Sequence, residues 1–300
     1  MSRYALIGDP VEHSPSPAML TAAFRAAGLP HTYEAIRVGA DELDGAWPRL
    51  RDELAGMNVT TPLKERVAAR ADELSPAARA SGSVNTVVFT GGRALGASTD
   101  GAGFLAALDH AAARTGGGMG PAVAPGGGEP ARAGSSVPPM GEEPSRAVVL
   151  GAGGAARAVA SALRGRGMRV AVAARRAEAS RKLAEELGVE TIAFDPGGLA
   201  DALADASLVV NATPASGADA SPVPDTVPLR PGLVVFDLVY RPRRTALLVR
   251  AEREGCVTIE GVEMLVEQGA RSFELWTGTA APVDEMRAAA LEALAGTGSR

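Results

Sequence analysis

The amino-acid sequence predicts an α/β protein with two domains, and two observations support this class. Segments typical of strands and of helices alternate through the first hundred residues, which is the pattern of a largely parallel sheet. A second series begins at residue 147, where an apolar run ends in closely spaced glycines and continues as Ala-rich helical sequence. The 300 residues, 46% of them hydrophobic, are enough for two cores of moderate size.

The first series begins with a strand over Arg3 to Ile7 and a glycine turn after it. A helix is expected over Ala18 to Ala27 and another over Asp41 to Leu54, with strands over Thr32 to Val38 and Gly56 to Thr60.

Three Ser-Pro or Thr-Pro pairs predict helix starts in this series. Ser16 is expected to cap the first helix, with Pro17 at its first position, and Thr61-Pro62 and Ser75-Pro76 repeat the device. A hairpin at the edge of the sheet is predicted from Thr86 to Ala97, because Gly91-Gly92 divides two strand-like runs.

The second series has the form of a strand, a tight turn and a helix start. Gly151, Gly153 and Ala156 match G-x-G-x-x-[G/A], in which the first glycine allows the turn, the second lets the backbone approach a pyrophosphate, and the third small residue packs helix on strand. The helix then offers free N–H groups to an anion. Because a second strand-like run, Arg169 to Ala173, follows one helix later, the pattern indicates a βαβ unit of the Rossmann type.

The residues after that second strand indicate which dinucleotide binds. NAD sites usually place Asp or Glu about 20 residues on, whereas this chain has Ala174-Arg175-Arg176. Two guanidinium groups suit a 2′-phosphate, so the sequence favours NADP(H). The alternative is that Arg175 and Arg176 are solvated loop residues.

Further elements complete the second series and the end of the chain. Strands are expected over Leu208 to Asn211 and Leu233 to Leu238, and helices are expected over Ala179 to Leu187, Gly261 to Trp276 and Val283 to Ala295.

Composition excludes several classes of protein. A net charge of −5 and a pI near 5.4 argue against a nucleic-acid partner, and no run reaches the roughly 18 apolar residues of a membrane span. Met1 to Pro10 lacks the layout of a signal peptide, so we expect a cytoplasmic protein. The single cysteine, Cys256, is expected to be a small buried residue of a strand. The three histidines have no metal-ligand spacing, so no metal site is predicted.

One segment between the two series differs in composition from the rest. Residues 115 to 145 include nine glycines and six prolines and almost nothing to bury, which predicts a flexible surface loop at the domain junction.

Lys64 is the first candidate for chemistry. It falls in the first turn of the helix expected after the third strand, where the helix dipole disfavours a cation, and this suits a proton acceptor or donor. The alternative is an ordinary surface lysine. Other polar stretches fall at the ends of neighbouring strands and helices. Because ligands bind at the carboxyl ends of parallel strands, these stretches favour a binding site around Lys64.

Taken together, these stretches resemble the shikimate dehydrogenase family. The matching motifs, in chain order, are Ser14-Pro15-Ser16-Pro17, Asn58-Val59-Thr60-Thr61-Pro62-Leu63-Lys64, Ser83-Val84-Asn85-Thr86, Thr99-Asp100-Gly101, Gly151 to Arg157, Asn211-Ala212-Thr213, Phe236 to Tyr240 and Gly261 to Phe273. The resemblance covers nearly the whole chain.

The resemblance implies a role for each matching residue. Lys64 is implied as the catalytic lysine, paired with Asp100, and the substrate-binding residues are implied to be Ser14, Ser16, Asn58, Thr60, Asn85, Tyr240 and Gln268. The implied cofactor-binding residues are Gly151, Gly153, Gly154, Ala155, Arg175, Arg176, Asn211, Thr213, Gly261 and Met264. Gln268 also fits on physical grounds, because an amide on the buried face of a helix calls for a hydrogen-bonding partner.

Two departures from the family's pattern are relevant to the site. Ser98 replaces the usual asparagine before Thr99-Asp100, which affects fine geometry rather than chemistry. Glu263 replaces a small residue and is expected near the nicotinamide end of the cleft.

The expected organisation is a substrate and catalytic domain over 1–103, an NADP-binding Rossmann domain over 104–261, and C-terminal helices over 262–300 that return to the first domain. The expected reaction is NADP-dependent reduction of 3-dehydroshikimate to shikimate, by a monomer or homodimer without a nucleic-acid or membrane partner. The alternatives are a quinate or aminoshikimate dehydrogenase and a non-catalytic NADP-binding regulator.

Overall fold

The computed structural model describes residues 1–114, 145–214 and 221–296. The loop expected over 115–145 therefore lies, except for Ser145, outside the described residues. Within the described part of the chain, every helix is too short or too polar to cross a membrane.

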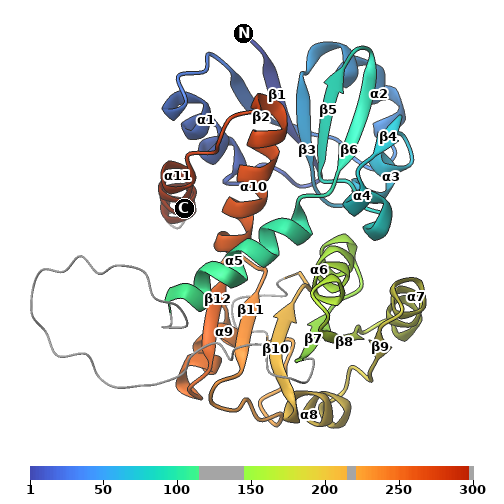
Figure 1. Cartoon of the computed structure of the whole chain (residues 1–300), viewed down its shortest axis with the longest axis vertical. Helices are drawn as coiled ribbons and strands as arrows, with labels where there is room; N and C mark the ends of the chain where they lie inside the picture. Colours follow the sequence, from blue (N-terminus) through green and yellow to red (C-terminus); the bar gives the residue numbers. More distant parts are fainter. Residues whose placement is uncertain (115–144, 215–220, 297–300) are drawn as a thin grey trace, which may run out of the picture.

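The first sheet has six strands in the order β2-β1-β3-β5-β6-β4 (Figure 1). The strands are β1 (Arg3–Gly8), β2 (Thr32–Arg37), β3 (Gly56–Val59), β4 (Glu73–Leu74), β5 (Thr86–Thr90) and β6 (Arg93–Ala97). The helices between them are α1 (Ser16–Ala26), α2 (Leu43–Glu53), α3 (Lys64–Ala68) and α4 (Pro76–Ser81). Every predicted strand and helix of this half is confirmed to within three residues at each end.

This sheet is less parallel than the sequence suggested. β1 runs parallel to β2 and β3, but β5 runs antiparallel to both β3 and β6. The predicted hairpin of β5 and β6 is confirmed, but the edge position is wrong because β4 pairs outside β6. β4 has only two residues, too few to leave a periodic signal in the sequence.

Only one of the three predicted helix caps is correct. The Ser75 hydroxyl accepts from the Ala78 N–H and caps α4. Ser16 does not cap α1 but is its first residue, because the Ser14 hydroxyl already accepts the Ser16 N–H. Thr61 does not cap α3, because a turn from Thr60 to Leu63 delays the helix until Lys64.

The second sheet is parallel throughout, with strand order β12-β11-β10-β7-β8-β9. Its strands are β7 (Arg146–Leu150), β8 (Arg169–Ala173), β9 (Glu190–Thr191), β10 (Ala206–Asn211), β11 (Val234–Asp237) and β12 (Val257–Glu260). The helices are α6 (Gly154–Gly165), α7 (Ala177–Leu187), α8 (Pro196–Ala204) and α9 (Ala246–Arg253). The order reverses between β7 and β10, which is the doubly wound arrangement of a Rossmann fold.

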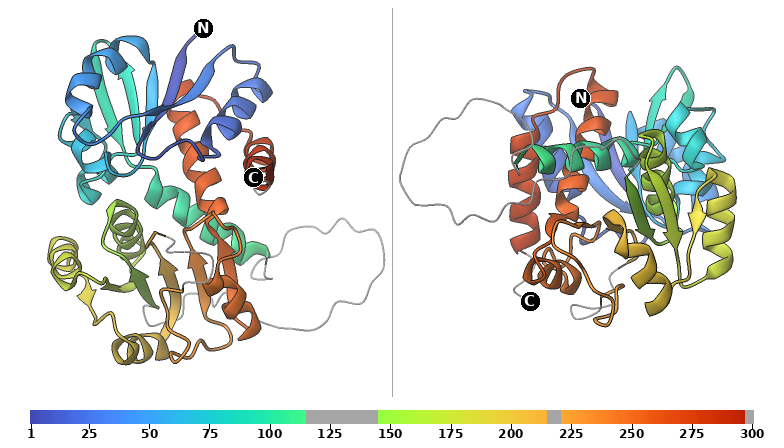
Figure 2. Two further views of the ribbon diagram at one scale, coloured as in Figure 1. Left: turned by 180° about the vertical axis from the view of Figure 1, so that it is seen from behind. Right: turned by 60° about the horizontal axis from the view of Figure 1, so that its bottom comes forward.

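Two long helices, α5 (Asp100–Arg114) and α10 (Gly261–Thr277), lie between the two sheets and cross each other (Figures 1 and 2). α10 contributes to the cores on both sides. Its Val266 and Phe273 pack with Tyr4 and Phe24 of the first sheet's core, whereas Met264 packs with the second. α11 (Val283–Gly296) then packs beside α1, so the C-terminal helices return to the first half as expected.

Cys256 departs from its expected burial. It lies just before β12 and is only partly buried, with its thiol donating to the Arg230 carbonyl at 3.4 Å.

Candidate active site

Lys64 and Asp100 meet at the carboxyl end of the first sheet. Lys64 begins α3 after β3, and Asp100 begins α5 after β6. The Lys64 Nζ donates to Asp100 Oδ2 at 2.5 Å, and their side chains are 17% and 5% exposed. An ammonium held by a carboxylate but still partly open to solvent can exchange a proton with a ligand hydroxyl.

Asn85 holds the aspartate from the other side. Its Nδ2 donates to Asp100 Oδ1 at 2.7 Å and also lies 3.0 Å from Gln268 Oε1. Its Oδ1 accepts the Thr99 N–H at 2.8 Å. Asn85 therefore fixes the start of α5 and joins it to α10, so Lys64, Asp100, Asn85 and Gln268 form one connected network.

Asn58 is satisfied entirely by protein groups. The Tyr33 hydroxyl donates to its Oδ1 at 2.7 Å, and its Nδ2 donates to the Asn85 carbonyl at 3.1 Å and to Ser272 Oγ at 2.9 Å. The buried side chain therefore braces Asn85 and has little left to offer a ligand. Burial also raises the pKa of Tyr33 well above its usual value, which keeps its hydroxyl a donor.

Tyr33 and Ser272 also belong to this network, although neither was predicted from the sequence. Ser272 lies one helical turn after Gln268 on the same face of α10, and this i, i+4 spacing is a signal that could have identified it. Tyr33 gives no comparable signal, because an aromatic residue in a strand usually means core packing.

Four expected substrate residues lie outside this network: Ser14, Ser16, Thr60 and Tyr240. The two serine hydroxyls are 3.1 Å apart in the loop that leads into α1, and they bond each other. The Thr60 side chain packs against Gly8. The Tyr240 hydroxyl has no hydrogen-bond partner among the described residues, and burial raises its pKa. None of the four is bonded to Lys64 or Asp100 in the described part of the chain.

The predicted glycine turn follows β7. Gly151 has φ +122°, and a Cβ there would lie 2.9 Å from the Ala212 carbonyl oxygen, so only glycine fits. Gly153 caps α6 and has open space where a Cβ would project, while Ala156 is fully buried against the sheet. At Gly154 a Cβ would lie 3.5 Å from Lys64 Cδ. The N-terminus of α6 therefore reaches Lys64, with Ala155 beside it.

Arg175 and Arg176 follow β8, the strand beside β7. Both side chains are exposed, and neither forms an ion pair with any described residue. The free guanidinium groups, the open Gly153 and the unused N–H groups of α6 together fit NADP(H).

The remaining expected cofactor residues contact other protein groups in this structure. Asn211 Nδ2 donates to Asp237 Oδ1 at 2.9 Å, and its Oδ1 accepts from Thr213 Oγ1 at 2.6 Å. Gly261 lets α10 approach β11, since a Cβ would lie 2.4 Å from the Leu238 carbonyl. Met264 is 7% exposed and packs in the second sheet's core.

Asp237 is a buried carboxylate that the sequence analysis did not single out. Burial raises its pKa, although bonds from Thr245, the Val239 N–H and Asn211 act in the opposite direction. It braces the ends of β10 and β11. In the described ranges no three His, Cys, Asp or Glu side chains come together as metal ligands.

Comparison with known proteins identifies the family. The model for the shikimate dehydrogenase substrate binding domain matches residues 6–87, that for shikimate / quinate 5-dehydrogenase matches 140–223, and that for the shikimate 5'-dehydrogenase C-terminal domain matches 261–291. The shikimate dehydrogenase (NADP(+)) of Methanopyrus kandleri is 42% identical over 96% of this chain and 94% of its own. The chain belongs to the shikimate dehydrogenase family.

Solved structures of the family support the same fold. Shikimate 5-dehydrogenase from Thermus thermophilus, in complex with NADP(H) and shikimate, is 38% identical, with a TM-score of 0.82 over 98% of this chain and all of that one. Quinate dehydrogenase from Corynebacterium glutamicum, in complex with NAD, is 29% identical, with a TM-score of 0.78 over 97% of this chain and 99% of that one.

Glu263, a departure from the shikimate dehydrogenase pattern, forms an ion pair with the C-terminal helix α11. Its Oε2 accepts from Arg287 Nε of α11 at 3.2 Å, and Arg287 also lies 3.7 Å from the buried Glu267. An arginine 24 residues later on a neighbouring helix therefore engages the carboxylate, and the expected place of Glu263 near the nicotinamide end of the cleft stays a prediction.

Ser98, the other departure, leaves Asp100 in place. Asn85 holds both Thr99 and Asp100 directly, so the position of α5 does not depend on the side chain before them. Ser98 is buried.

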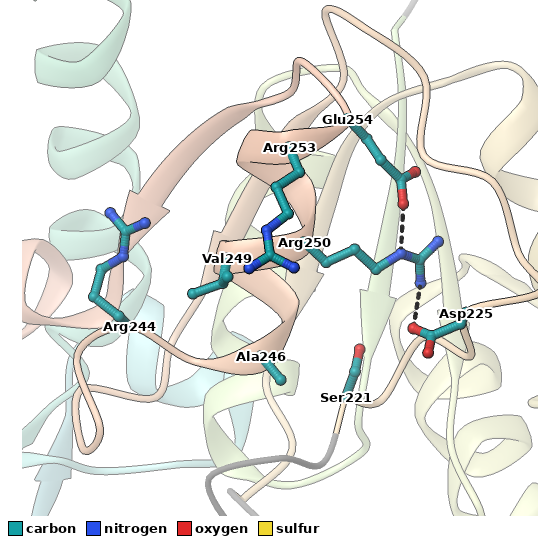
Figure 3. Close-up of a pocket in the computed structure, with 8 residues that line it drawn as sticks. All are labelled: Ser221, Asp225, Arg244, Ala246, Val249, Arg250, Arg253 and Glu254. Atoms are coloured by element: carbon teal, nitrogen blue, oxygen red, sulfur yellow. Dashed lines mark hydrogen bonds and ion pairs between the residues drawn. The ribbon is translucent and has the colours of Figure 1, made fainter.

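A pocket elsewhere on the shikimate dehydrogenase fold, between α9 and the loop after residue 220, is lined by none of the expected site residues (Figure 3). Arg250 crosses it and pairs with Glu254 at 2.6 Å and with Asp225 at 3.7 Å. Because its guanidinium is engaged by these carboxylates and by backbone carbonyls, it fastens this loop to α9.

Proposed function

We propose that this chain catalyses the reversible NADP-dependent reduction of 3-dehydroshikimate to shikimate, in the pathway to aromatic amino acids. The observation that carries the proposal is the Lys64–Asp100 pair, held by Asn85 and Gln268 and lying against the N-terminus of α6. This arrangement puts a proton-transfer pair beside a dinucleotide site, as oxidation of a secondary alcohol requires.

In the proposed mechanism Lys64 moves the proton at the hydroxyl oxygen of the substrate. Asp100 orients the ammonium through one carboxylate oxygen, and Asn85 keeps the other oxygen in place. Gln268 and Tyr240 bind the substrate from the side of α10, while Ser14 and Ser16 bind its carboxylate and a hydroxyl. Asn58 acts by bracing Asn85, and Thr60 lines the site from the end of β3.

NADP(H), when bound, supplies or accepts the hydride. We assign its pyrophosphate to Gly151, Gly153, Gly154 and Ala155, and its 2′-phosphate to Arg175 and Arg176. Met264 and Gly261 shape the nicotinamide side, with Asn211 and Thr213 fixing the loop after β10. This assignment corresponds to a substrate domain over 1–103, an NADP domain over 104–261 and returning helices over 262–300.

The same proposal places the enzyme in the cytoplasm as a monomer or a homodimer. A non-catalytic regulator is disfavoured, because such a protein has no need of a lysine and an aspartate held 2.5 Å apart.

The test is NADPH formation by the purified protein with shikimate, quinate and aminoshikimate in parallel, each repeated with NAD. We expect shikimate with NADP to be strongly preferred. Preference for quinate or aminoshikimate would move the protein to a specialised or catabolic role, and the absence of turnover with all three acids would contradict the proposal.

A further inference from the structure

The hydroxyl of Ser83 is fully buried and has no hydrogen-bond partner among the described residues. The backbone N–H of the same residue is satisfied, since it donates to the Ala78 carbonyl. An unpaired buried hydroxyl is unfavourable compared with alanine, so the serine calls for a partner that the folded chain alone does not supply.

Ser83 lies where the two halves of the molecule touch. A Cβ built on Gly154, the first residue of α6, would lie 3.0 Å from Ser83 Oγ and 3.5 Å from Lys64 Cδ. The hydroxyl therefore faces the N-terminus of a helix from the second sheet, beside the stem of the catalytic lysine.

The N-terminus of α6 attracts anions. α6 has twelve residues, and its first N–H groups have no acceptor within the helix. An anion bound there carries oxygens that accept hydrogen bonds, which is what the Ser83 hydroxyl lacks.

We propose that Ser83 belongs to the cofactor site and donates its hydroxyl to the pyrophosphate of NADP(H) bound at the N-terminus of α6. Gly154 lies against the Ser83 hydroxyl in this structure. The hydrogen bond from Ser83 to the pyrophosphate therefore forms as the bound phosphate moves Gly154 and Ser83 apart. The inference rests on the proposed function, because it assigns a further residue to the same cofactor. It makes Ser83 a direct link between the bound cofactor and the half of the molecule that carries Lys64.

The experiment compares Ser83→Ala with Ser81→Ala. Ser81 is a matched control, since it is a buried serine two residues away whose hydroxyl already donates to the Ala77 carbonyl at 2.8 Å. NADPH affinity is measured by calorimetric titration of the protein in the absence of the second substrate. Ser83→Ala is expected to weaken binding about 10- to 100-fold, the loss of a hydrogen bond to a charged group. Ser81→Ala is expected to bind NADPH like the parent.

Two further measurements separate a cofactor contact from a structural role. Adenosine 2′-monophosphate lacks the pyrophosphate, so its affinity is expected to be the same for Ser83→Ala and the parent. The melting temperature of cofactor-free Ser83→Ala is expected to be unchanged or higher, because an unpaired hydroxyl is removed. Ser83→Cys, a second variant of similar size, is expected to bind NADPH as weakly as Ser83→Ala.

The outcomes distinguish the two proposals. If the parent protein binds NADPH and Ser83→Ala binds it within about twofold as well, the role of Ser83 is wrong and the proposed function stands. Equal losses for NADPH and adenosine 2′-monophosphate overturn the pyrophosphate contact. If the parent itself binds no NADPH, the proposed function is wrong and the inference fails with it.

Discussion

Gly103 lies directly against the backbone of Gln268 where α5 crosses α10. A Cβ built on Gly103 would lie 2.5 Å from the Gln268 nitrogen and 2.7 Å from its Cα. The backbone carbonyl of Gln268 also accepts a hydrogen bond from the Thr99 hydroxyl at 3.0 Å. The close spacing of α5 and α10 therefore requires a residue without a side chain at position 103, and the position of the Gln268 amide depends on this spacing.

Gly103→Ala is expected to lower the free energy of unfolding by about 1–3 kcal/mol, because backbone atoms must move apart to admit the methyl group. The shift of Gln268 is expected to raise the KM for shikimate more than it lowers kcat. Gly45→Ala in α2 is the matched control, since nothing lies within 4 Å of that Cβ. Urea unfolding and steady-state kinetics measure both effects. Equal stabilities for the two variants would contradict the close crossing.

Lys64→Ala is expected to lower kcat by about 10²–10⁴-fold, because it removes the group that moves the proton. NADPH affinity is expected to stay nearly intact, since only the lysine stem lies near Gly154. Stopped-flow hydride transfer and an independent titration of NADPH separate the two effects. Activity that survives in Lys64→Ala would show that the proposed mechanism is wrong.

Arg175→Ala and Arg176→Ala are expected to weaken NADPH binding, together by about 10- to 100-fold, through the loss of charge-assisted bonds to the 2′-phosphate. NADH binding is expected to change little. Because both side chains are exposed without ion pairs to described residues, the melting temperature is expected to stay the same. Equal losses of affinity for NADPH and NADH would contradict the assignment of Arg175 and Arg176 to the 2′-phosphate.

The glycine turn could be predicted from the sequence because its signal is local. The apolar strand, Gly151 and the buried Ala156 all fall within eleven residues, and the structure has each in its expected place. The pairing of Lys64 with Asp100 came from the family resemblance, since 36 residues separate them and neither one's neighbours specify the other.

The bracing of Asn58 could not be predicted, because its partners come from distant elements. Tyr33 is 25 residues away on β2 and Ser272 is 214 residues away on α10, so their meeting depends on strand register and helix crossing. The pairing of Glu263 with Arg287 could not be predicted for the same reason, since it depends on where α11 packs.

Glu263→Ala is expected to lower the free energy of unfolding by about 0.2–1 kcal/mol, the usual range for a partly exposed ion pair. Because the carboxylate is already engaged by Arg287, KM for NADP and for shikimate are expected to stay unchanged. Arg287→Met is the second single variant of a double-mutant cycle. Urea unfolding of the parent, both single variants and the double variant gives the interaction free energy between Glu263 and Arg287. A large change in KM for NADP in Glu263→Ala would instead support the predicted place of Glu263 near the nicotinamide.

Cys256 is expected to react slowly with iodoacetamide in the native protein. Burial, and then the nearby Glu254 carboxylate, raise the pKa of its thiol from 9.0 to about 11. The alkylation rate, followed by mass spectrometry against pH, is expected to rise with a midpoint near 11 in the native protein and near 9.0 in urea. Because the sequence has one cysteine, Cys256→Ser removes the signal and serves as the control.

The same shift fixes the sign of a pH effect on stability. Between pH 9.0 and about 11 the unfolded chain releases the thiol proton while the native protein retains it. The free energy of unfolding therefore decreases as pH rises through this window, and the contribution is fully present below it. Comparing the parent with Cys256→Ser isolates this contribution, because the serine does not titrate there. A native alkylation midpoint near 9.0, or a difference between the two proteins that does not change across the window, would contradict the burial of the thiol beside Glu254.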